Sequence, residues 1–273
     1  MNSADAVPNH STTTKQQQRA ALDSKEYDEM WHDLPDFIKY NPGSRHRRRM
    51  IRSILKRIQF QTLLDVGCGN AELIHELNRV FGSGVRMEGA EYSPEVVRQN
   101  QQRFPNIPFH VIDVEKAPLP QQYDLVTCSE VIEHLNDVRA AFKTLAAMVK
   151  PGGHLLVTCP TGRMYATEKH FGHTRHPNLL ELHDHAQRTG LTVVKSFSWG
   201  FPTFKTMKWA TNVNADWALK NFATGAYTPA AKALANVLYY VNYLNVSSPW
   251  GCQLVALMRR DGGAAAATPA AGR

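Results

Sequence analysis

Two groups of side chains in the middle of the chain have types and spacings that could carry chemistry. Glu130, Glu133 and His134 are spaced i, i+3 and i+4, so in a helical turn their side chains would share one face. Carboxylates and an imidazole are ligands that Mg²⁺ or Zn²⁺ takes in proteins, which makes this set a candidate metal half-site. His173 and His176 follow later in the chain. Because a histidine near its ordinary pKa is a natural proton acceptor, we treat His134, His173 and His176 as candidate catalytic residues.

The elements that must position these residues begin with residues 63–69, which read LLDVGCG. A short apolar run, two glycines and a following helix-period segment predict the first βα unit of a nucleotide-binding α/β sheet. Gly67 and Gly69 let the backbone approach a ligand closely, and the helix amino terminus beyond them offers free N–H donors.

The spacing of the glycines also indicates the kind of nucleotide. A dinucleotide fingerprint that starts at Gly67 would need glycine at position 72, where the chain has Glu72. A carboxylate there would repel a pyrophosphate, so NAD is disfavoured. Asp65, at the end of the predicted strand, can receive the ammonium of a cationic ligand.

Further strands are predicted at 85–92, 107–113 and 123–129. Glu91 lies about twenty residues past the glycines, which is the usual place for an acid that binds ribose hydroxyls. The next two strands end at Asp113 and at Ser129, which precedes Glu130. Four predicted strands therefore deliver polar residues to one edge of the sheet.

The chain resembles the class I S-adenosylmethionine-dependent methyltransferases in five motifs that follow the order of that family. They are D-V-G-C-G-N at 65–70, G-A-E-Y-S at 89–93, V-I-D-V at 111–114, Y-D-L-V-T-C-S-E-V-I-E-H-L at 123–135 and V-K-P-G-G-H-L-L-V-T at 149–158. The resemblance spans roughly half of the chain. Ala71 departs from the pattern, since many members have a third glycine there.

This resemblance implies S-adenosylmethionine as the cofactor. Asp65, Gly67 and Gly69 would hold its methionine part, Glu91 the ribose hydroxyls and Asp113 the adenine amine. Ser129 and Glu130 would form the floor near the sulfonium. The full predicted cofactor set is Asp65, Gly67, Cys68, Gly69, Glu91, Tyr92, Asp113, Val114, Ser129 and Glu130.

Resemblance also bears on the predicted metal set. The segment with Glu130, Glu133 and His134 is similar to the metal-binding helix of the ubiquinone-biosynthesis O-methyltransferases and of the small-RNA terminal 2′-O-methyltransferases. The same letters occur in relatives that bind no metal, where the acids favour a helix amino terminus and the histidine packs on the fold. Both interpretations, a Mg²⁺ or Zn²⁺ site and a structural turn, stay open.

We predict an α/β fold with a Rossmann-like, seven-stranded, mostly parallel sheet and helices on both faces. A helical amino-terminal cap and a helical insertion before the last strand would be added to it. The predicted boundaries are a disordered tail at 1–24, the cap at 25–60, the cofactor-binding core at 61–200, an aromatic lid insertion at 201–250, the last core strand at 251–260 and a disordered tail at 261–273.

The insertion is far longer than a tight hairpin, at about fifty residues. It contains the aromatic residues Phe201, Phe204, Trp209, Trp217, Phe222, Tyr227, Tyr239, Tyr240, Tyr243 and Trp250. These residues would either pack on the core or form a lid over an apolar or aromatic substrate. The candidate substrate contacts are Tyr165, Arg175, Phe201, Phe204 and Trp209.

A basic segment between Arg45 and Arg57 contributes much of the net charge of +7. Such a run can be the solvated face of an amphipathic helix, or it can meet a phosphorylated substrate, an anionic membrane surface or RNA. Nucleic acid is not expected, because the chain shows no recognisable RNA-binding module and the long insertion is aromatic rather than basic.

Composition limits the remaining classes. The 273 residues include 43% hydrophobic residues, enough for one sizeable core, and no apolar run of transmembrane length or signal-peptide pattern is evident. Four cysteines without metal-type spacing predict reduced thiols and a cytoplasmic location.

Taken together, these features predict a small-molecule methyltransferase that acts on an oxygen atom of an apolar or aromatic acceptor. The alternatives are a metal-dependent RNA 2′-O-methyltransferase and a catalytically silent cofactor-binding subunit that regulates a partner.

Overall fold

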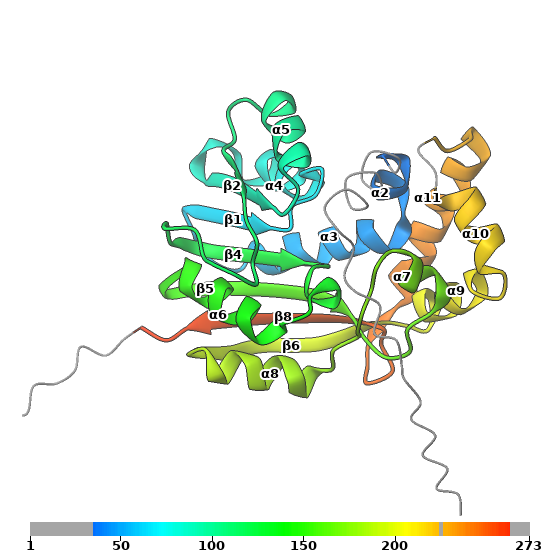
Figure 1. Cartoon of the computed structure of the whole chain (residues 1–273). Helices are drawn as coiled ribbons and strands as arrows, with labels where there is room; N and C mark the ends of the chain where they lie inside the picture. The colour runs from blue at the N-terminus through cyan, green and yellow to red at the C-terminus, as the bar shows by residue number, and fades with distance from the viewer. Residues whose placement is uncertain (1–34, 224–225, 263–273) are drawn as a thin grey trace, which may run out of the picture.

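The computed structural model describes residues 35–223 and 226–262 (Figure 1). The predicted tail at 1–24, residues 25–34 of the predicted cap and the carboxyl-terminal tail beyond Gly262 lie outside these ranges. Among the described residues, no helix is both long enough and apolar enough to cross a bilayer.

An eight-stranded sheet forms the centre of the molecule, with strand order β3-β2-β1-β4-β5-β8-β6-β7. Strands β3, β2, β1, β4 and β5 are parallel, and β8 runs antiparallel between β5 and β6. The bounds are β1 (Thr62–Val66), β2 (Arg86–Glu91), β3 (Phe109–Val111), β4 (Tyr123–Ser129), β5 (Val149–Pro160), β6 (Leu191–Phe201), β7 (Val246–Ser247) and β8 (Gln253–Arg260).

The predicted Rossmann-like fold is confirmed, and the count of strands is one higher than the expected seven. The extra strand is β7, a two-residue piece of the insertion that pairs with the edge strand β6. Strand β6 also runs to Phe201, one residue into the span predicted for the insertion, which in the structure occupies residues 202–252 between β6 and β8.

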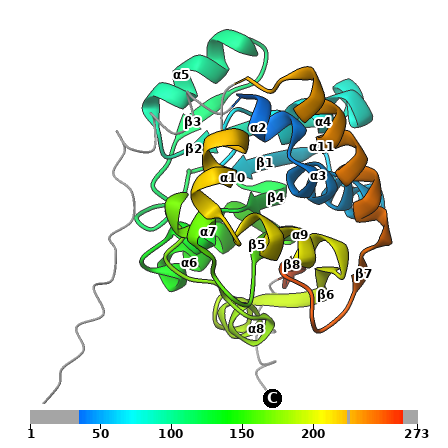
Figure 2. The ribbon, with the colours of Figure 1, turned by 90° about the vertical axis from the view of Figure 1, so that its right-hand side faces the viewer.

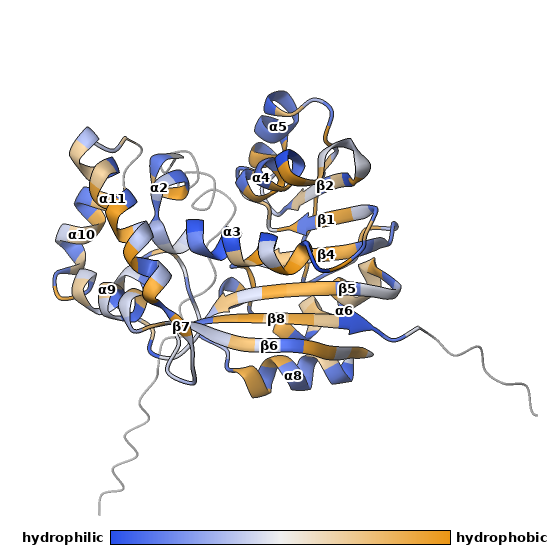
Figure 3. Ribbon diagram, turned by 180° about the vertical axis from the view of Figure 1, so that it is seen from behind, coloured by the Kyte–Doolittle hydropathy of each residue, from blue (hydrophilic) through white to orange (hydrophobic). Residues whose placement is uncertain are grey.

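Helices cover both faces of the sheet, and each face has its own apolar cluster. Residues of α6 (Val138–Met148) and α8 (Leu179–Arg188) share one cluster, while α3 (Pro42–Leu55) and α4 (Glu72–Phe81) contribute to the other. Figure 3 shows the apolar strands between them and α3 lying across the sheet. The helix α5 (Pro94–Arg103) packs against β2 and β3, and Ser93 caps its start, because Ser93 Oγ accepts a hydrogen bond from the Val96 N–H.

A layer of short helices stands at the carboxyl ends of the parallel strands (Figures 1 and 2). This helical layer consists of α2 (Pro35–Tyr40), α7 (Ala166–His170), α9 (Thr203–Thr211), α10 (Ala215–Phe222) and α11 (Pro229–Val241), the last three from the insertion. In parallel α/β sheets ligands bind outside the carboxyl ends of the strands, so the helical layer covers the edge where a site is expected.

All four cysteines are buried free thiols, as the sequence predicts. Burial raises the pKa of Cys68, Cys128, Cys159 and Cys252, so these thiols stay protonated and unreactive at neutral pH.

Candidate active site

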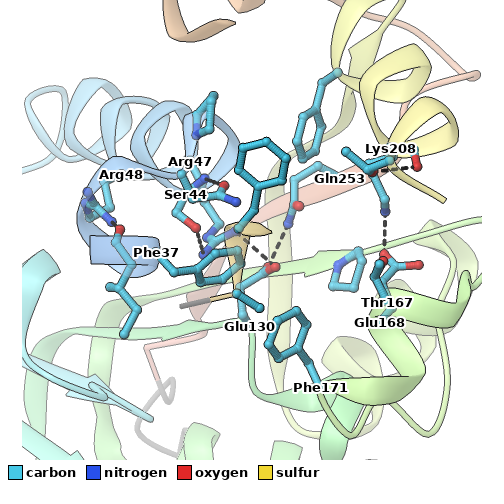
Figure 4. Close-up of a pocket in the computed structure, with 18 of the residues that line it drawn as sticks. Phe37, Ser44, Arg47, Arg48, Glu130, Thr167, Glu168, Phe171, Lys208 and Gln253 are labelled. Carbon is cyan, nitrogen blue, oxygen red and sulfur yellow. Dashed lines mark hydrogen bonds and ion pairs between the residues drawn. The ribbon is translucent and has the colours of Figure 1, made fainter. Parts of the chain in front are cut away.

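A cavity of about 420 Å³ lies between the carboxyl ends of β1 and β4 and the helical layer (Figure 4). One part of its wall is polar and comes from the loops after the strands, including Asp65, Gly67, Cys68, Ser129 and Glu130. The other part is largely apolar and comes from the helical layer and its neighbours, with Phe37, Ile38, Phe171, Phe204, Met207, Leu219, Phe222, Leu234 and Leu238. The cavity therefore joins a polar end to an apolar end.

At the polar end, Asp65 is buried and its Oδ1 accepts a 2.6 Å hydrogen bond from Thr127 Oγ1. Burial raises the pKa of Asp65 to about 7, and the nearby Glu91 carboxylate adds to this effect. A cation that enters beside Asp65 would favour the ionised form. Binding of a positively charged ligand would therefore convert Asp65 from its protonated to its ionised form.

The loop after β1 depends on glycine at position 67. Gly67 has φ +69°, in the left-handed region, and a Cβ at this position would lie 2.2 Å from Val131 Cγ2. The following Ala71 also has a positive φ, of 61°. The chain can therefore turn from β1 into α4 while its backbone stays open toward the cavity.

Four residues of the predicted cofactor set, Glu91, Tyr92, Asp113 and Val114, are not among the residues that line the cavity. Glu91 is buried, and its two carboxylate oxygens accept hydrogen bonds from the backbone N–H groups of Gly69 (2.8 Å) and Tyr92 (2.6 Å). Tyr92 itself is exposed. The carboxylate of Asp113 lies 2.8 Å from Lys116 Nζ, and Val114 is buried. The cofactor roles of these four residues stay predictions.

Glu130 occupies the floor of the cavity, where it joins three elements. It has φ 59°, and its carboxylate meets Arg47 Nη1 of α3 at 3.0 Å and accepts a 2.7 Å hydrogen bond from Gln253 Nε2 of β8 (Figure 4). Ser129 lines the cavity beside it and shares a 2.8 Å hydrogen bond with the hydroxyl of Thr158. Arg47 and Gln253 were not predicted as site residues, because both approach Glu130 from distant parts of the chain.

Near this floor, a buried glutamate is surrounded by histidines. Glu133 is completely buried, and within the described residues neither of its carboxylate oxygens has a hydrogen-bond partner. Burial raises the pKa of Glu133 well above its ordinary range, and Glu130 adds to the effect. Donor atoms of Glu133, His134 and His173 lie within 4.8 Å of one another.

The histidines of this cluster are neutral at ordinary pH. Burial lowers the pKa of His134 and His176, and it lowers the pKa of His173 to about 2. His173 Nδ1 lies 3.2 Å from His176 Nε2, and His134 and His173 line the cavity, while His176 is not among the lining residues. An imidazole with so low a proton affinity acts as a hydrogen-bond acceptor or a metal ligand rather than as a cation.

The structure does not assemble the metal set in the predicted form. Glu130 points to Arg47 and Gln253, whereas His173 joins Glu133 and His134. The expected helical turn is also wrong, because the left-handed backbone at Glu130 precedes a short 3₁₀ helix, η2 (Ile132–His134).

A second feature that was not predicted from the sequence is a shielded ion pair between two helices of the helical layer, α7 and α9. Lys208 Nζ of α9 lies 2.5 Å from Glu168 Oε1 of α7, and both residues line the cavity (Figure 4). The same Glu168 oxygen is 3.6 Å from His176 Nε2, and the other accepts a hydrogen bond from the Tyr165 N–H. Glu168 therefore connects α9 of the insertion to the histidine cluster.

Of the predicted substrate contacts, only Phe204 lines the cavity. Tyr165 precedes α7 and Arg175 pairs with Glu181 at 2.8 Å. Phe201 packs edge-on against Trp250, with ring centroids 5.4 Å apart, and Trp209 is exposed. A substrate role for these four residues has no support from the geometry.

Comparison with known proteins gives the family. Residues 30–196 match a family model described as a methyltransferase domain. The ubiquinone biosynthesis O-methyltransferase of Acinetobacter baylyi is 36% identical over 97 residues, which are 34% of this chain and 41% of that protein. The enzyme of the same name from Bordetella avium is 31% identical over 126 residues, which are 45% of this chain and 52% of that protein. The chain thus matches about half of the length of these curated relatives or less.

A solved structure supports the fold over a longer stretch. The N-methyltransferase NodS from Bradyrhizobium japonicum WM9, in complex with S-adenosyl-L-homocysteine, superposes with a TM-score of 0.51 at 18% identity. The superposition covers 82% of this chain and 90% of NodS. Because the family model spans more than half of the chain, and the cofactor motifs lie within it, the protein belongs to the class I S-adenosylmethionine-dependent methyltransferases.

Proposed function

We propose that the protein transfers the methyl group of S-adenosylmethionine to an oxygen atom of a small apolar or aromatic acceptor. One observation carries this proposal. The same cavity has the loop after β1 at its polar end and the apolar residues of the helical layer at its other end. Methyl transfer from a sulfonium needs the acceptor, the methyl carbon and the sulfur in line. Oriented placement of this kind can be worth roughly 7 to 11 kcal/mol of the barrier.

The polar end offers complementary charges to the methionine part of the cofactor. Ionised Asp65 would bind the ammonium group, and Arg47 would bind the carboxylate after giving up part of its contact with Glu130. The sulfonium would then lie over the floor formed by Ser129 and Glu130. This orientation directs the methyl group toward the apolar end.

Oxygen as the acceptor atom is supported by two facts. The curated relatives are named O-methyltransferases. The cavity wall also presents neutral imidazoles, His134 and His173, that can accept a hydrogen bond from an acceptor hydroxyl. Because His173 binds a proton weakly, it would orient the hydroxyl, and the proton released on methylation would pass to solvent water rather than stay on the imidazole.

The alternative to hydrogen bonding by these imidazoles is a divalent cation held by Glu133, His134 and His173. The residues fit such an ion, because a buried carboxylate without a hydrogen-bond partner and two neutral imidazoles place their donor atoms within 4.8 Å. When bound, Mg²⁺ or Zn²⁺ would act as a Lewis acid on an acceptor hydroxyl. Glu133 and the histidines would hold it, and the apolar wall would exclude water.

The catalytic test uses methyl-labelled S-adenosylmethionine with two matched panels of apolar aromatic acceptors, one with hydroxyl groups and one with amino groups. We expect label in the hydroxyl panel only. Cofactor binding with transfer to amines alone, or with no transfer to either panel, would contradict the proposal.

The metal test is independent of turnover. Titration calorimetry with MgCl₂ or ZnCl₂ should give saturable binding to the wild type and none to Glu133→Gln, while Glu95→Gln on the exposed surface of α5 should bind as the wild type does. Equal binding by all three proteins would place the ion elsewhere, and absence of binding by the wild type would end the metal proposal.

A further inference from the structure

The helix α11 and the segment that follows it have apolar side chains on the side that faces solvent. Val237, Tyr240 and Leu244 are 58%, 68% and 68% exposed, and with Val241 they follow the spacing i, i+3, i+4 and i+7. Ala235 is buried on the other side of the helix. A surface helix normally presents polar residues to solvent, whereas α11 and the short helix η3 (Asn242–Leu244) present apolar ones there.

The exposed apolar surface continues beyond the helix. Tyr243 on η3, Val246 on β7 and Trp250 in the following loop are all exposed. Figure 2 shows that α11 leads down into β7 along one side of the helical layer, and Figure 3 shows apolar turns along α11. We call this surface, formed by Val237, Tyr240, Val241, Tyr243, Leu244, Val246 and Trp250, the apolar face. Scattered exposed apolar residues need no explanation, but a run of this length marks an interaction surface.

Cationic side chains of α3 border the apolar face. The guanidinium of Arg45 lies 3.9 Å from the ring centroid of Tyr239, and that of Arg49 lies 4.3 Å from that of Tyr243. Arg52 and Lys56 follow Arg49 at helical spacing, and Lys56 is exposed. We call these four residues, Arg45, Arg49, Arg52 and Lys56, the basic row of α3.

Acidic residues are missing from both segments. The sequence has no Asp or Glu between Asp36 and Asp65, which includes all of α3, and none between Asp216 and Asp261, which includes all of α11, η3 and β7. The apolar face and its border therefore combine aliphatic groups, aromatic rings and positive charge, with no negative charge from either segment.

We propose that the apolar face and the basic row of α3 bind the surface of an anionic lipid bilayer. Tyrosine and tryptophan favour the boundary between headgroups and acyl chains, and valine and leucine would enter the apolar side of that boundary. The arginines and lysine would meet the lipid phosphates. This surface would hold the protein on the membrane without a spanning segment.

Charge and side-chain type favour a membrane over two other partners. A symmetric contact with a second copy would bring the two basic rows toward each other, and like charges across an interface are unfavourable. A nucleic acid would use the cations and the aromatic rings but would leave the aliphatic residues Val237, Val241, Leu244 and Val246 in water.

The first experiment measures co-sedimentation of the purified protein with vesicles of phosphatidylcholine and phosphatidylglycerol in equal parts, and with vesicles of phosphatidylcholine alone. We expect binding to the mixed vesicles and much weaker binding to the neutral ones. The triple variant Val237→Ser, Tyr240→Ser, Leu244→Ser should lose at least about tenfold in affinity for mixed vesicles. The double variant Leu180→Ser, Val194→Ser, at sites 79% and 55% exposed on α8 and β6, is the matched control and should bind as the wild type does.

A second pair of variants tests the charge. Arg52→Glu with Lys56→Glu should weaken binding by roughly fivefold or more for each charge removed, and added salt should reduce the difference. Lys143→Glu, at an exposed position of α6, should change little. These charge changes, at the half-buried Arg52 and the exposed Lys56, keep the proposal testable if the triple variant does not fold, which thermal unfolding will reveal.

Four results would overturn the proposal. They are equal binding to neutral and anionic vesicles, no binding to either, equal losses in the triple variant and its matched control, and a wild-type dimer that the single change Tyr240→Ser converts to a monomer. The last result would assign the apolar face to contact between copies of the chain.

Discussion

Replacing Asp65 by asparagine should stabilise the cofactor-free protein while it weakens cofactor binding. Asparagine has nearly the same shape, and its side-chain oxygen can still accept the hydrogen bond that Thr127 Oγ1 donates to Asp65. The change therefore removes a buried negative charge and leaves the packing in place.

The size of the effect follows from the pKa. Burial raises the pKa of Asp65 from its ordinary 3.8 to about 7. A tenfold change in proton affinity is worth about 1.4 kcal/mol, so keeping this carboxylate ionised in the fold costs about 4 kcal/mol. Since the folded protein binds the proton more tightly than the unfolded chain, the cost grows as the pH rises from about 4 to about 7 and stays constant above that.

Urea denaturation at pH 5 and pH 8 measures this cost directly. The gain in unfolding free energy from Asp65→Asn should be about 3 kcal/mol larger at pH 8 than at pH 5, because two pH units separate pH 5 from the pKa of about 7. A gain of the same size at both pH values, or a loss at pH 8, would refute the reasoning.

Cofactor binding by the wild type should be stronger at high pH than at low pH. The affinity of the wild type for S-adenosylmethionine should fall by roughly tenfold for each pH unit below about 7, because the ammonium group needs the ionised carboxylate. Titration calorimetry of Asp65→Asn should give weak binding without this dependence. A wild-type affinity that does not change between pH 5 and pH 7 would remove Asp65 from the proposed ammonium site.

Two further predictions concern the cavity wall. Gly67→Ala should destabilise the protein by roughly 1 to 3 kcal/mol more than Gly82→Ala. Both glycines have positive φ, but only the Cβ added at position 67 would overlap a neighbouring side chain. Equal losses of stability in thermal unfolding would contradict this prediction. Lys208→Met should lower stability by about 3 kcal/mol and lower turnover, because it leaves the shielded Glu168 carboxylate without its cation, whereas Lys205→Met at an exposed position of the same helix should do neither.

The parts of the site that the sequence could predict are local in the chain. The strand, turn and helix at 63–69 follow from the spacing of apolar residues and glycines, and Asp65, Gly67 and Cys68 line the cavity as expected. Glu130 also reaches the cavity, because the carboxyl ends of parallel strands meet at one edge.

The parts that the sequence could not predict depend on distant contacts. Arg47 stands in a run of similar arginines, and helical spacing alone does not reveal that it, rather than Arg45, meets Glu130. The Lys208 to Glu168 pair joins residues 40 positions apart in the chain. The expectation of a helical face for Glu130, Glu133 and His134 failed because spacing carries no information on the left-handed backbone at Glu130.

The way the insertion is attached has a consequence for how this enzyme could diversify. Trp199 of β6 pairs with Gln253 of β8, so the chain leaves the sheet and returns to it at neighbouring positions. A cassette of another length or composition could be exchanged between these two strands without a change in the register of β6 with β8 or in the loop after β1. Selection could therefore change the apolar part of the cavity and the exposed apolar face by rewriting one contiguous stretch of the gene.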